Sequence, residues 1–322
     1  MQPDQQPNLA TELALLLLLA FLWGASYPLI KIAVETIPPV TLIAVRVAIA
    51  AALLSLVVCW RRLAMPRDGK TWRAFFVQAC FNSILSWTLL AWGQQFVDSG
   101  LAGILNSTSP IFVFLITLLI TRHEAVSAGK LFGAVMGLVG VTIIIGPGVL
   151  AGLGRDVIAQ LAVLAGAVCY AGAAIYGRRF SGLPAVVTAA ATMICATLCL
   201  VPLAVVIDRP WTVRPSVESA VVAVAGGVFS TALAMLLYFR LVRTLGSMGV
   251  ASQSYLRTGV AVAIGVLLLG EPFTWPVGLG LAAVVVGVAA INGQGRLFKA
   301  RRRPPRLQSA SPAIPGRTHR PS

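Results

Sequence analysis

An arginine in the middle of an apolar stretch is the residue best placed to bind a ligand. Arg257 lies roughly 13 residues from either end of the stretch Thr244 to Gly270, near the centre of a bilayer core about 30 Å thick. A charge there is costly unless it is paired or hydrated. All ten carboxylates lie in loops, in tails or at span ends: Asp4, Glu12, Glu35, Asp68, Asp98, Glu124, Asp156, Asp208, Glu218 and Glu271. We therefore expect a substrate carboxylate to pair with Arg257; the alternative is a structural cation held by backbone carbonyls.

A proline in another apolar stretch frees a second polar group. Pro110 has no N–H to donate to the carbonyl of Asn106, four residues earlier. That carbonyl and the Asn106 side chain can accept hydrogen bonds from a substrate ammonium or amide, as broken helices do in transporters. The alternative is a packing kink whose carbonyl is satisfied by a neighbouring serine or threonine. Gln253, one turn before Arg257, adds a further polar side chain.

Five aromatic side chains within apolar stretches are candidates for the wall of a substrate pocket. They are Trp23, Tyr27, Trp87, Tyr170 and Tyr238. Tryptophan and tyrosine also gather at membrane interfaces because their rings are amphipathic, so a belt or packing role is the alternative for each. Trp23 and Tyr170 are favoured as pocket residues because they occupy matching positions in the two halves of the chain.

The remaining polar residues near the spans are assigned structural or gating roles, as is Pro110. Arg46 is at most about ten residues from one end of its span, so its side chain can reach the interface or organise helix ends. Lys31 follows the first apolar stretch. Glu124 and Glu271 each end an apolar run, where a carboxylate is hydrated or caps the next helix, so we expect structure rather than proton transfer.

The elements that position these residues must be membrane-spanning helices. The 322 residues are 58% hydrophobic and 11% charged, with a mean hydropathy of +0.88, whereas soluble domains are about a quarter charged. Eight stretches without Asp, Glu, Lys or Arg are long enough to span a bilayer: Leu13 to Ile30, Ala74 to Val97, Ser99 to Thr121, Leu131 to Gly154, Val157 to Gly177, Phe180 to Ile207, Ser219 to Phe239 and Pro272 to Gly295. Two more contain one arginine, Thr36 to Trp60 and Thr244 to Gly270. We predict an all-α integral membrane protein with ten transmembrane helices.

Basic residues between the spans predict the orientation in the cytoplasmic membrane. If the N-terminus is cytoplasmic, nineteen of the 25 Lys and Arg residues fall on the cytoplasmic side and four on the outer side, as the positive-inside rule requires. Both termini are then cytoplasmic. The tail from Arg296 onward carries eight of these charges and no apolar face, so we expect it to be disordered and to contact anionic lipids. Nucleic acid is a poor second partner.

The chain repeats itself at an offset of 147 residues. This offset pairs Trp23 with Tyr170, Lys31 with Arg178, Glu124 with Glu271, Gly133 with Gly280, and Gly140 with Gly287. Each unit holds five spans, an odd number, so the second unit must enter the membrane from the other side. We predict two inverted five-helix repeats, 12–146 and 157–293, a linker 147–156, a cytoplasmic N-terminal tail 1–11 and a basic tail 294–322.

At these residues the chain resembles the EamA family of the drug/metabolite transporter superfamily. The resemblance rests on three groups of residues: Leu22-Trp23-Gly24 with Ser26 and Lys31; Pro38-Pro39 and Arg46; and Tyr255-Leu256 to Gly265, Leu269-Gly270-Glu271, Gly280 and Gly287. The first half echoes the last group with Pro110, Glu124, Gly133 and Gly140. The resemblance covers roughly residues 12 to 293 and implies a ten-helix transporter of small metabolites or drugs. It departs at Thr258, where the family usually has proline.

These observations predict a secondary transporter for a small anionic or zwitterionic metabolite, amino acids first, acting in efflux by alternating access. The alternatives are an exporter of hydrophobic or cationic drugs, which the missing midplane carboxylate disfavours, and a non-transporting scaffold or receptor. We expect no enzyme, because the histidines are only His123 and His319 and there is no carboxylate pair or nucleophile with a base. No cofactor, metal or disulfide framework is expected. Gly133 and Gly137 can pack helices within the monomer or, as the sharper alternative, in a homodimer.

Overall fold

The computed structural model describes residues 8–97, 99–122, 127–146, 150, 153, 156–260 and 274–301. Over these residues the protein is helical and has no strand. Its α-helices are α1 (Leu9–Gly24), α2 (Ser26–Ala33), α3 (Pro39–Trp60), α4 (Gly69–Ala79), α5 (Ser86–Gly93), α6 (Ser99–Asn106), α7 (Ser109–Ile116), α8 (Ala128–Ile145), α9 (Val157–Gly177), α10 (Ala185–Ile207), α11 (Val217–Ala225), α12 (Ala234–Ala251) and α14 (Trp275–Arg301). π-Helical segments at Cys80–Leu85, Thr117–Thr121 and Gly226–Leu233 continue or join them.

Eight of the described helical segments are long and apolar enough to cross a membrane. They are Leu9–Ala33, Pro39–Trp60, Gly69–Gly93, Leu101–Thr121, Val157–Phe180, Ala185–Ile207, Val217–Ala251 and Trp275–Gly293, with a shorter apolar helix at Ala128–Ile144. Each corresponds to a stretch expected from the sequence. The tenth expected stretch, Thr244 to Gly270, is described only to residue 260, so the count of ten stays a prediction.

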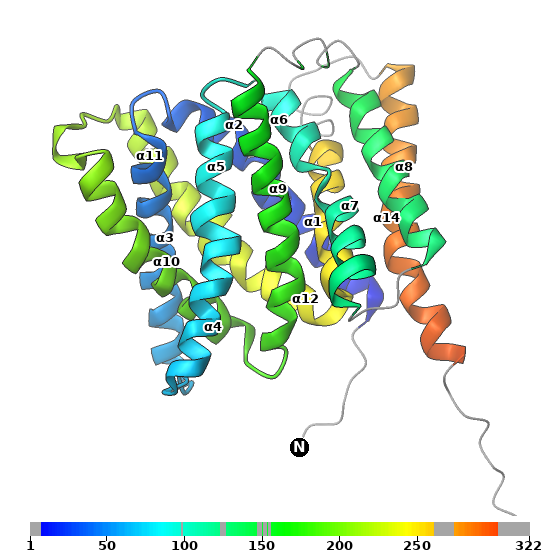
Figure 1. The fold of residues 1–322 in the computed structure, drawn as a ribbon, viewed down its shortest axis with the longest axis horizontal. Helices are drawn as coiled ribbons and strands as arrows, with labels where there is room; N and C mark the ends of the chain where they lie inside the picture. The colour runs from blue at the N-terminus through cyan, green and yellow to red at the C-terminus, as the bar shows by residue number, and fades with distance from the viewer. Residues whose placement is uncertain are drawn as a thin grey trace, which may run out of the picture.

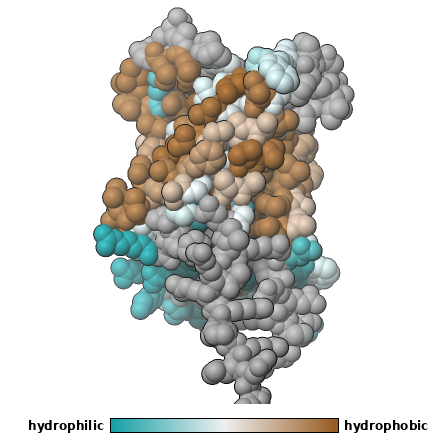
Figure 2. Space-filling view, turned by 90° about the vertical axis from the view of Figure 1, so that its right-hand side faces the viewer, coloured by the Kyte–Doolittle hydropathy of each residue, from teal (hydrophilic) through white to brown (hydrophobic). Residues whose placement is uncertain are grey.

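The outer surface of the bundle is apolar, as lipid contact requires. Ile120 is 74% exposed and Leu56 67% exposed, and in water such surfaces would drive aggregation. Figure 2 shows that brown apolar side chains dominate the middle band of one face and that hydrophilic side chains gather below it. In Figure 1 the helices stand side by side, with α1 beginning and α14 ending on the same side. We call this side the N-terminal face and the other side the opposite face.

Breaks in several helices have identifiable local causes. Pro110 lies in the first turn of α7, and the chain between α6 and α7 forms a turn at Ser107 and Thr108. Gly246 lies inside α12 with φ 80° and ψ 178°, a conformation open essentially to glycine alone, so one helix stops there and another begins. The sequence placed Arg240 in a loop between spans, but it lies in α12, because nothing interrupts the helix before Gly246.

Two helix pairs join the halves of the chain through close packing. Helix α8 lies along α14, and α3 lies along α10 (Figure 1). A methyl group placed on Gly133 would lie 2.7 Å from the carbonyl oxygen of Gly287, and one on Gly140 would lie 2.6 Å from that of Gly280. The contact therefore needs glycine, and it joins residues of the same chain. As the number rises along α8, the partner's number falls along α14, so these helices are antiparallel.

Candidate functional site

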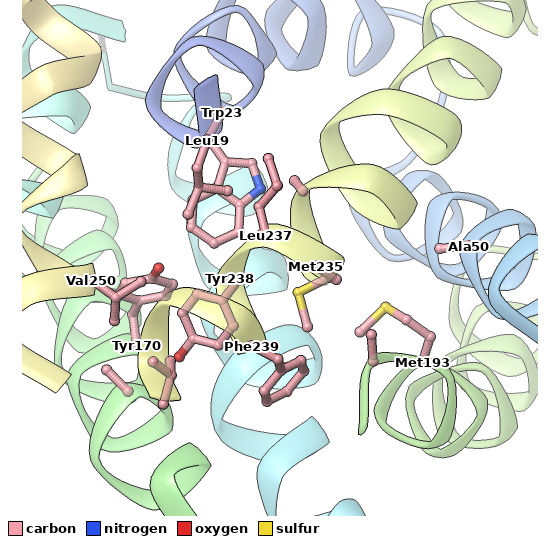
Figure 3. Close-up of a cluster of buried hydrophobic side chains, with 14 of the residues drawn as sticks. Leu19, Trp23, Ala50, Tyr170, Met193, Met235, Leu237, Tyr238, Phe239 and Val250 are labelled. Atoms are coloured by element: carbon pink, nitrogen blue, oxygen red, sulfur yellow. The ribbon is translucent and has the colours of Figure 1, made fainter. Parts of the chain in front are cut away.

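Three aromatic rings from three helices meet in the centre of the bundle. Trp23 of α1, Tyr170 of α9 and Tyr238 of α12 have ring centroids 5.7 to 5.8 Å apart, and Figure 3 shows them converging. The Trp23 indole Nε1 donates to the carbonyl of Ser230 at 2.9 Å, and the Ser230 hydroxyl donates to the carbonyl of Leu22 at 2.8 Å. These contacts fix the plane of the Trp23 ring.

The guanidinium of Arg257 lies against this aromatic cluster. Its Cζ is 4.9 Å from the centroid of the Trp23 ring, within the range of a cation–π contact. Its Nε donates to Oε1 of Gln253 at 2.6 Å, and Nε2 of Gln253 donates to the Tyr170 hydroxyl at 3.4 Å. A side chain at Gly24 would touch Arg257, 3.6 Å from its Cβ. Gln253, which is fully buried, thus holds Arg257 from behind.

A second arginine, Arg46 of α3, is held in a similar way. Its Cζ is 6.0 Å from the centroid of the Trp87 ring, and its Nε donates to the hydroxyl of Thr231 at 3.3 Å. That hydroxyl donates in turn to the carbonyl of Gly226 at 2.9 Å, so its lone pairs face the guanidinium. Arg46 is only 5% exposed and does not reach the interface, as the sequence reading had allowed. A side chain at Gly226 would press on its Nε, 3.3 Å away.

Both arginines line one cavity. Its wall consists of Trp23, Ser26, Ile30, Ile43, Arg46, Ser86, Trp87, Leu90, Asn106, Tyr170 and Arg257. All of these residues are described, and none is an aspartate or a glutamate. The Ser86 hydroxyl donates to the carbonyl of Gly166 at 2.9 Å and can still accept a bond from a ligand. The cavity is therefore cationic, aromatic on two sides and lined by small polar groups.

The structure brings together five of the eight residues assigned to the substrate site from the sequence. Trp23, Trp87, Asn106, Tyr170 and Arg257 line the cavity. Two more lie behind its wall: Gln253 supports Arg257, and Tyr238 packs on Trp23. The side chain of Tyr27, the eighth, lies outside the described residues, although its backbone is in α2.

The residues given structural or gating roles lie in different places. Nζ of Lys31 donates to the carbonyl of Gln94 at 3.4 Å, which ties α2 to the end of α5. The carbonyl of Asn106, to which Pro110 has no N–H to donate, accepts from the Ser109 hydroxyl at 2.6 Å. This bond matches the alternative interpretation of Pro110, a packing kink whose carbonyl is satisfied by a neighbouring serine. Glu124 and Glu271 lie outside the described residues.

Several wall residues were not predicted from the sequence, and Arg46 lies at the cavity rather than near the membrane interface. Ser26 and Ile30 follow Trp23 along the same face of α1 and α2, and Ser86 precedes Trp87. Their closeness in sequence to Trp23 and Trp87 is the feature that could have predicted them as wall residues. Arg46 gave no local signal of its position, because its partner Thr231 lies 185 residues away in the chain.

At the N-terminal face, α1 and α12 are joined by an ion pair around Glu12. This carboxylate is buried, and its Oε1 accepts from Nη2 of Arg240 at 2.8 Å and from Nε at 3.3 Å. Its Oε2 accepts from the Thr244 hydroxyl at 2.8 Å. The Arg240 side chain is 47% exposed, so water reaches one partner of the pair but not the other. We call Glu12, Arg240 and Thr244 the polar latch.

Comparisons with known proteins agree with this architecture. The pattern that defines the EamA-like transporter family matches residues 10–146 and 157–293. Similar proteins include the "Uncharacterized transporter YvbV" of Bacillus subtilis, 27% identical over 92% of this chain and 96% of its own length. The "Uncharacterized inner membrane transporter YedA" of Escherichia coli K12 is 26% identical over 88% of this chain and 91% of its length.

A solved structure titled "Crystal structure of protein" has the same fold. It superimposes with a TM-score of 0.71 at 18% identity, covering 89% of this chain and 99% of its own. At that identity the likeness speaks for the fold alone. The family pattern covers both halves of the chain, the helices are long and apolar, and similar proteins are named transporters. This chain is therefore a multi-pass membrane protein that belongs to the EamA-like transporter family.

Proposed function

We propose that the protein is a secondary transporter that moves a small anionic or zwitterionic metabolite, amino acids first, out of the cell by alternating access. The observation that carries this proposal is the cavity in which Arg257, stacked on Trp23 and supported by Gln253, lies in a wall without a carboxylate. A guanidinium with its plane fixed in this way suits the bidentate binding of a substrate carboxylate.

Alternating access requires two states, and the packing of α8 on α14 supports an inverted repeat that would supply them. Gly133 faces Gly287, and Gly140 faces Gly280. The 147-residue offset relates Gly133 to Gly280 and Gly140 to Gly287, so it converts one contact into the other. Antiparallel helices related in this way have a two-fold axis across them, which lies in the plane of the membrane. The hydroxyl of Ser107 also donates to the carbonyl of Ser254, its equivalent 147 residues on, at 3.3 Å.

The distribution of basic side chains supports a cytoplasmic N-terminal face. Because the spans alternate in direction, the described basic residues on that face are Arg61, Arg62, Arg67, Lys70, Arg73, Arg122, Lys130, Arg178, Arg179, Arg240, Arg243, Arg296, Lys299 and Arg301. The opposite face has Lys31, Arg209 and Arg214 among the described residues. Under the positive-inside rule, both α1 and the end of α14 then face the cytoplasm.

A cluster of buried polar side chains adjoins the aromatic rings. Gln78, Asn82 and Tyr238 are fully buried there. The side chains of Gln78 and Asn82 lie within hydrogen-bonding reach of the Tyr238 hydroxyl, and Nε2 of Gln78 donates to the carbonyl of Ala173 at 3.2 Å. A polar cluster buried next to the aromatic rings is suited to a second state in which its groups meet substrate or water.

Two other functions fit the cavity less well. Export of hydrophobic or cationic drugs would use the aromatic walls at Trp23, Trp87 and Tyr170, but the two guanidinium groups would repel a cation. A non-transporting scaffold or receptor would not need a cationic cavity in the centre of the bundle.

Transport by Arg257 variants in proteoliposomes tests the proposed function. Arg257→Lys keeps the charge but loses the planar fork, so we expect initial rates of a carboxylate substrate to fall about tenfold. Arg257→Gln should lower them about a hundredfold, the effect of about 3 kcal/mol from a lost charged hydrogen bond. The matched control is Arg243→Gln, on exposed surface outside the cavity, which should leave the rate unchanged. Rates are compared per folded protein, with and without a pH gradient.

The substrate panel includes metabolites with and without a carboxylate. Equal losses for both classes, or loss of folded protein alone, would mean that Arg257 is structural, and the anionic-substrate proposal would then be dropped.

A further inference from the structure

We propose that the cavity selects substrates with two carboxylates, such as a dicarboxylate or an acidic amino acid, one bound by Arg257 and the other by Arg46. This inference rests on the proposed function, because it names the substrate class of the same site. Its basis is the second guanidinium, which the sequence had assigned to structure and which the fold brings to the cavity wall.

The two arginines are built into the wall by the same type of contacts. Each uses its Nε for a bond to the protein, Arg257 to Gln253 at 2.6 Å and Arg46 to Thr231 at 3.3 Å. Each Cζ lies near a tryptophan ring, at 4.9 Å and 6.0 Å. An arginine held at Nε with a ring beside it has fewer orientations open to its fork, which suits carboxylate binding. Two such groups provide two binding positions.

One π-helical turn connects the two positions. Ser230 and Thr231 are consecutive residues of Gly226–Leu233. The Ser230 carbonyl holds the indole of Trp23, the ring under Arg257, and the Thr231 hydroxyl holds Arg46. A π-helical turn presents successive groups differently from an α-helix and is frequent at functional sites. One local element therefore contacts both the ring under Arg257 and the guanidinium of Arg46.

The polar latch shows how this chain neutralises an arginine that serves structure. Arg240 is half exposed and still receives a buried carboxylate, that of Glu12, at 2.8 Å. Arg46 is 5% exposed, and its contacts with the described residues are a hydroxyl and a ring rather than a carboxylate. A buried cation without a carboxylate in the wall around it is stabilised by an anion that binds in the cavity.

Matched substrates in proteoliposomes test the inference on the wild-type protein first. Succinate carries two carboxylates, and its monomethyl ester has nearly the same size with one. Glutamate and alanine give the same comparison among amino acids, and glycerol phosphate asks whether a compact dianion replaces two separate groups. We expect succinate and glutamate to compete for uptake at least tenfold better than their single-carboxylate partners, and glycerol phosphate less well than succinate.

The arginine variants then divide the two positions. Arg46→Gln should lower transport of succinate at least tenfold while leaving monomethyl succinate within about threefold, so that the preference disappears. Arg257→Gln should lower both. If Arg46→Gln does not fold, Arg46→Lys and Thr231→Val answer the same question, because the first keeps the charge without the fork and the second removes the Nε partner with similar volume.

The outcomes separate this inference from the proposed function. Wild-type protein that transports single-carboxylate substrates as well as succinate, with Arg257 still required, would overturn the two-carboxylate inference alone. So would equal losses for both substrate classes in Arg46→Gln. Transport that is independent of both arginines would overturn the proposed function as well.

Discussion

The helix pair α1 and α12 and the helix pair α9 and α5 occupy corresponding places in the two halves of the chain but are joined by different chemistry. At the N-terminal face, the first pair is joined by the polar latch, in which the buried Glu12 accepts from Arg240 and Thr244. At the 147-residue offset, Glu12 corresponds to Ala159, Arg240 to Gly93 and Thr244 to Val97. None of the three can form an ion pair.

The second pair is joined by close apolar packing. A methyl group placed on Gly93 would lie 2.6 Å from Cγ2 of Val163 and 3.0 Å from the carbonyl oxygen of Ala159. Val97, Ala159 and Val163 are buried together in a small apolar cluster of their own. The contact between α5 and α9 therefore depends on the absence of a side chain at position 93.

The difference indicates what each contact costs to open. Separating the polar latch releases a carboxylate and a half-exposed guanidinium, and water solvates both. Separating the apolar contact exposes hydrophobic surface and gains no new polar interaction with water, at about 25 cal/mol for each Å² exposed. We therefore expect the N-terminal contact to respond to charge and the opposite contact to respond to volume.

The largest effect is expected from adding volume at Gly93. The side chain of Gly93→Val would overlap Val163 and the backbone of Ala159, so the helices must move apart. Overpacking of this kind costs about 3 kcal/mol where backbone lies on one side. We expect a clear drop in the thermal unfolding midpoint in detergent.

Gly182→Val is the matched control for Gly93→Val, because Gly182 has nothing within 4 Å of its added carbon. Its unfolding midpoint should stay close to that of the wild type. A midpoint that falls equally in both variants would contradict the account of the α5–α9 contact.

A smaller effect is expected from breaking the polar latch. Arg240→Ala leaves the Glu12 carboxylate buried with Thr244 as its remaining partner. Removing one partner of a fully buried pair costs about 3–5 kcal/mol, and because Arg240 is 47% exposed we expect about 2 kcal/mol. The measurement is the thermal unfolding midpoint of the purified protein.

Two further variants sharpen the test of the polar latch. Arg243→Ala, on the same helix and exposed, should cost much less. Glu12→Gln combined with Arg240→Ala should recover part of the loss, because the buried charge is then gone. No recovery in the double variant would show that Arg240 acts through packing rather than through charge.

The sequence predicted the helices well because spanning a bilayer leaves a strong pattern. The stretch Pro39–Trp60 was expected with an error of three residues at its start, since Pro38 and Pro39 mark where a helix can begin. The 147-residue offset favoured Trp23 and Tyr170 as pocket residues, and both line the cavity with their rings 5.7 Å apart.

The contacts between distant segments could not be predicted in the same way. Glu12 and Arg240 are 228 residues apart, and a charge near a span end looks the same whether it meets water or a partner. The contacts of Arg46 with Trp87 and Thr231 depend on how α3, α5 and the π-helical turn pack. Periodicity and composition carry no information on such packing.

The smallest effect is expected at the helix caps, where the two faces again differ in charge. Helix α4 begins after Asp68, whose carboxylate accepts from the amide of Thr71 at 2.7 Å. Helix α11 begins after Ser216, whose hydroxyl accepts from the amide of Ser219 at 3.1 Å. The hydrogen bonds from Thr71 hold the pKa of Asp68 below its ordinary value of 3.8.

Because the pKa of Asp68 is lower in the folded protein, its charge stabilises the fold above pH 3.8, and this contribution is lost as the pH falls through the folded-state value. Asp68→Asn keeps a capping side chain without the charge. We expect it to reduce the unfolding midpoint slightly at pH 6 and by less at pH 3. Ser216→Ala should instead give a small loss of about 1 kcal/mol that is the same at both pH values. The opposite result would be a midpoint difference from the wild type that stays constant in acid for Asp68→Asn and shrinks for Ser216→Ala. The caps would then not differ in charge as proposed, and the contrast between the two faces would rest on the polar latch and Gly93 alone.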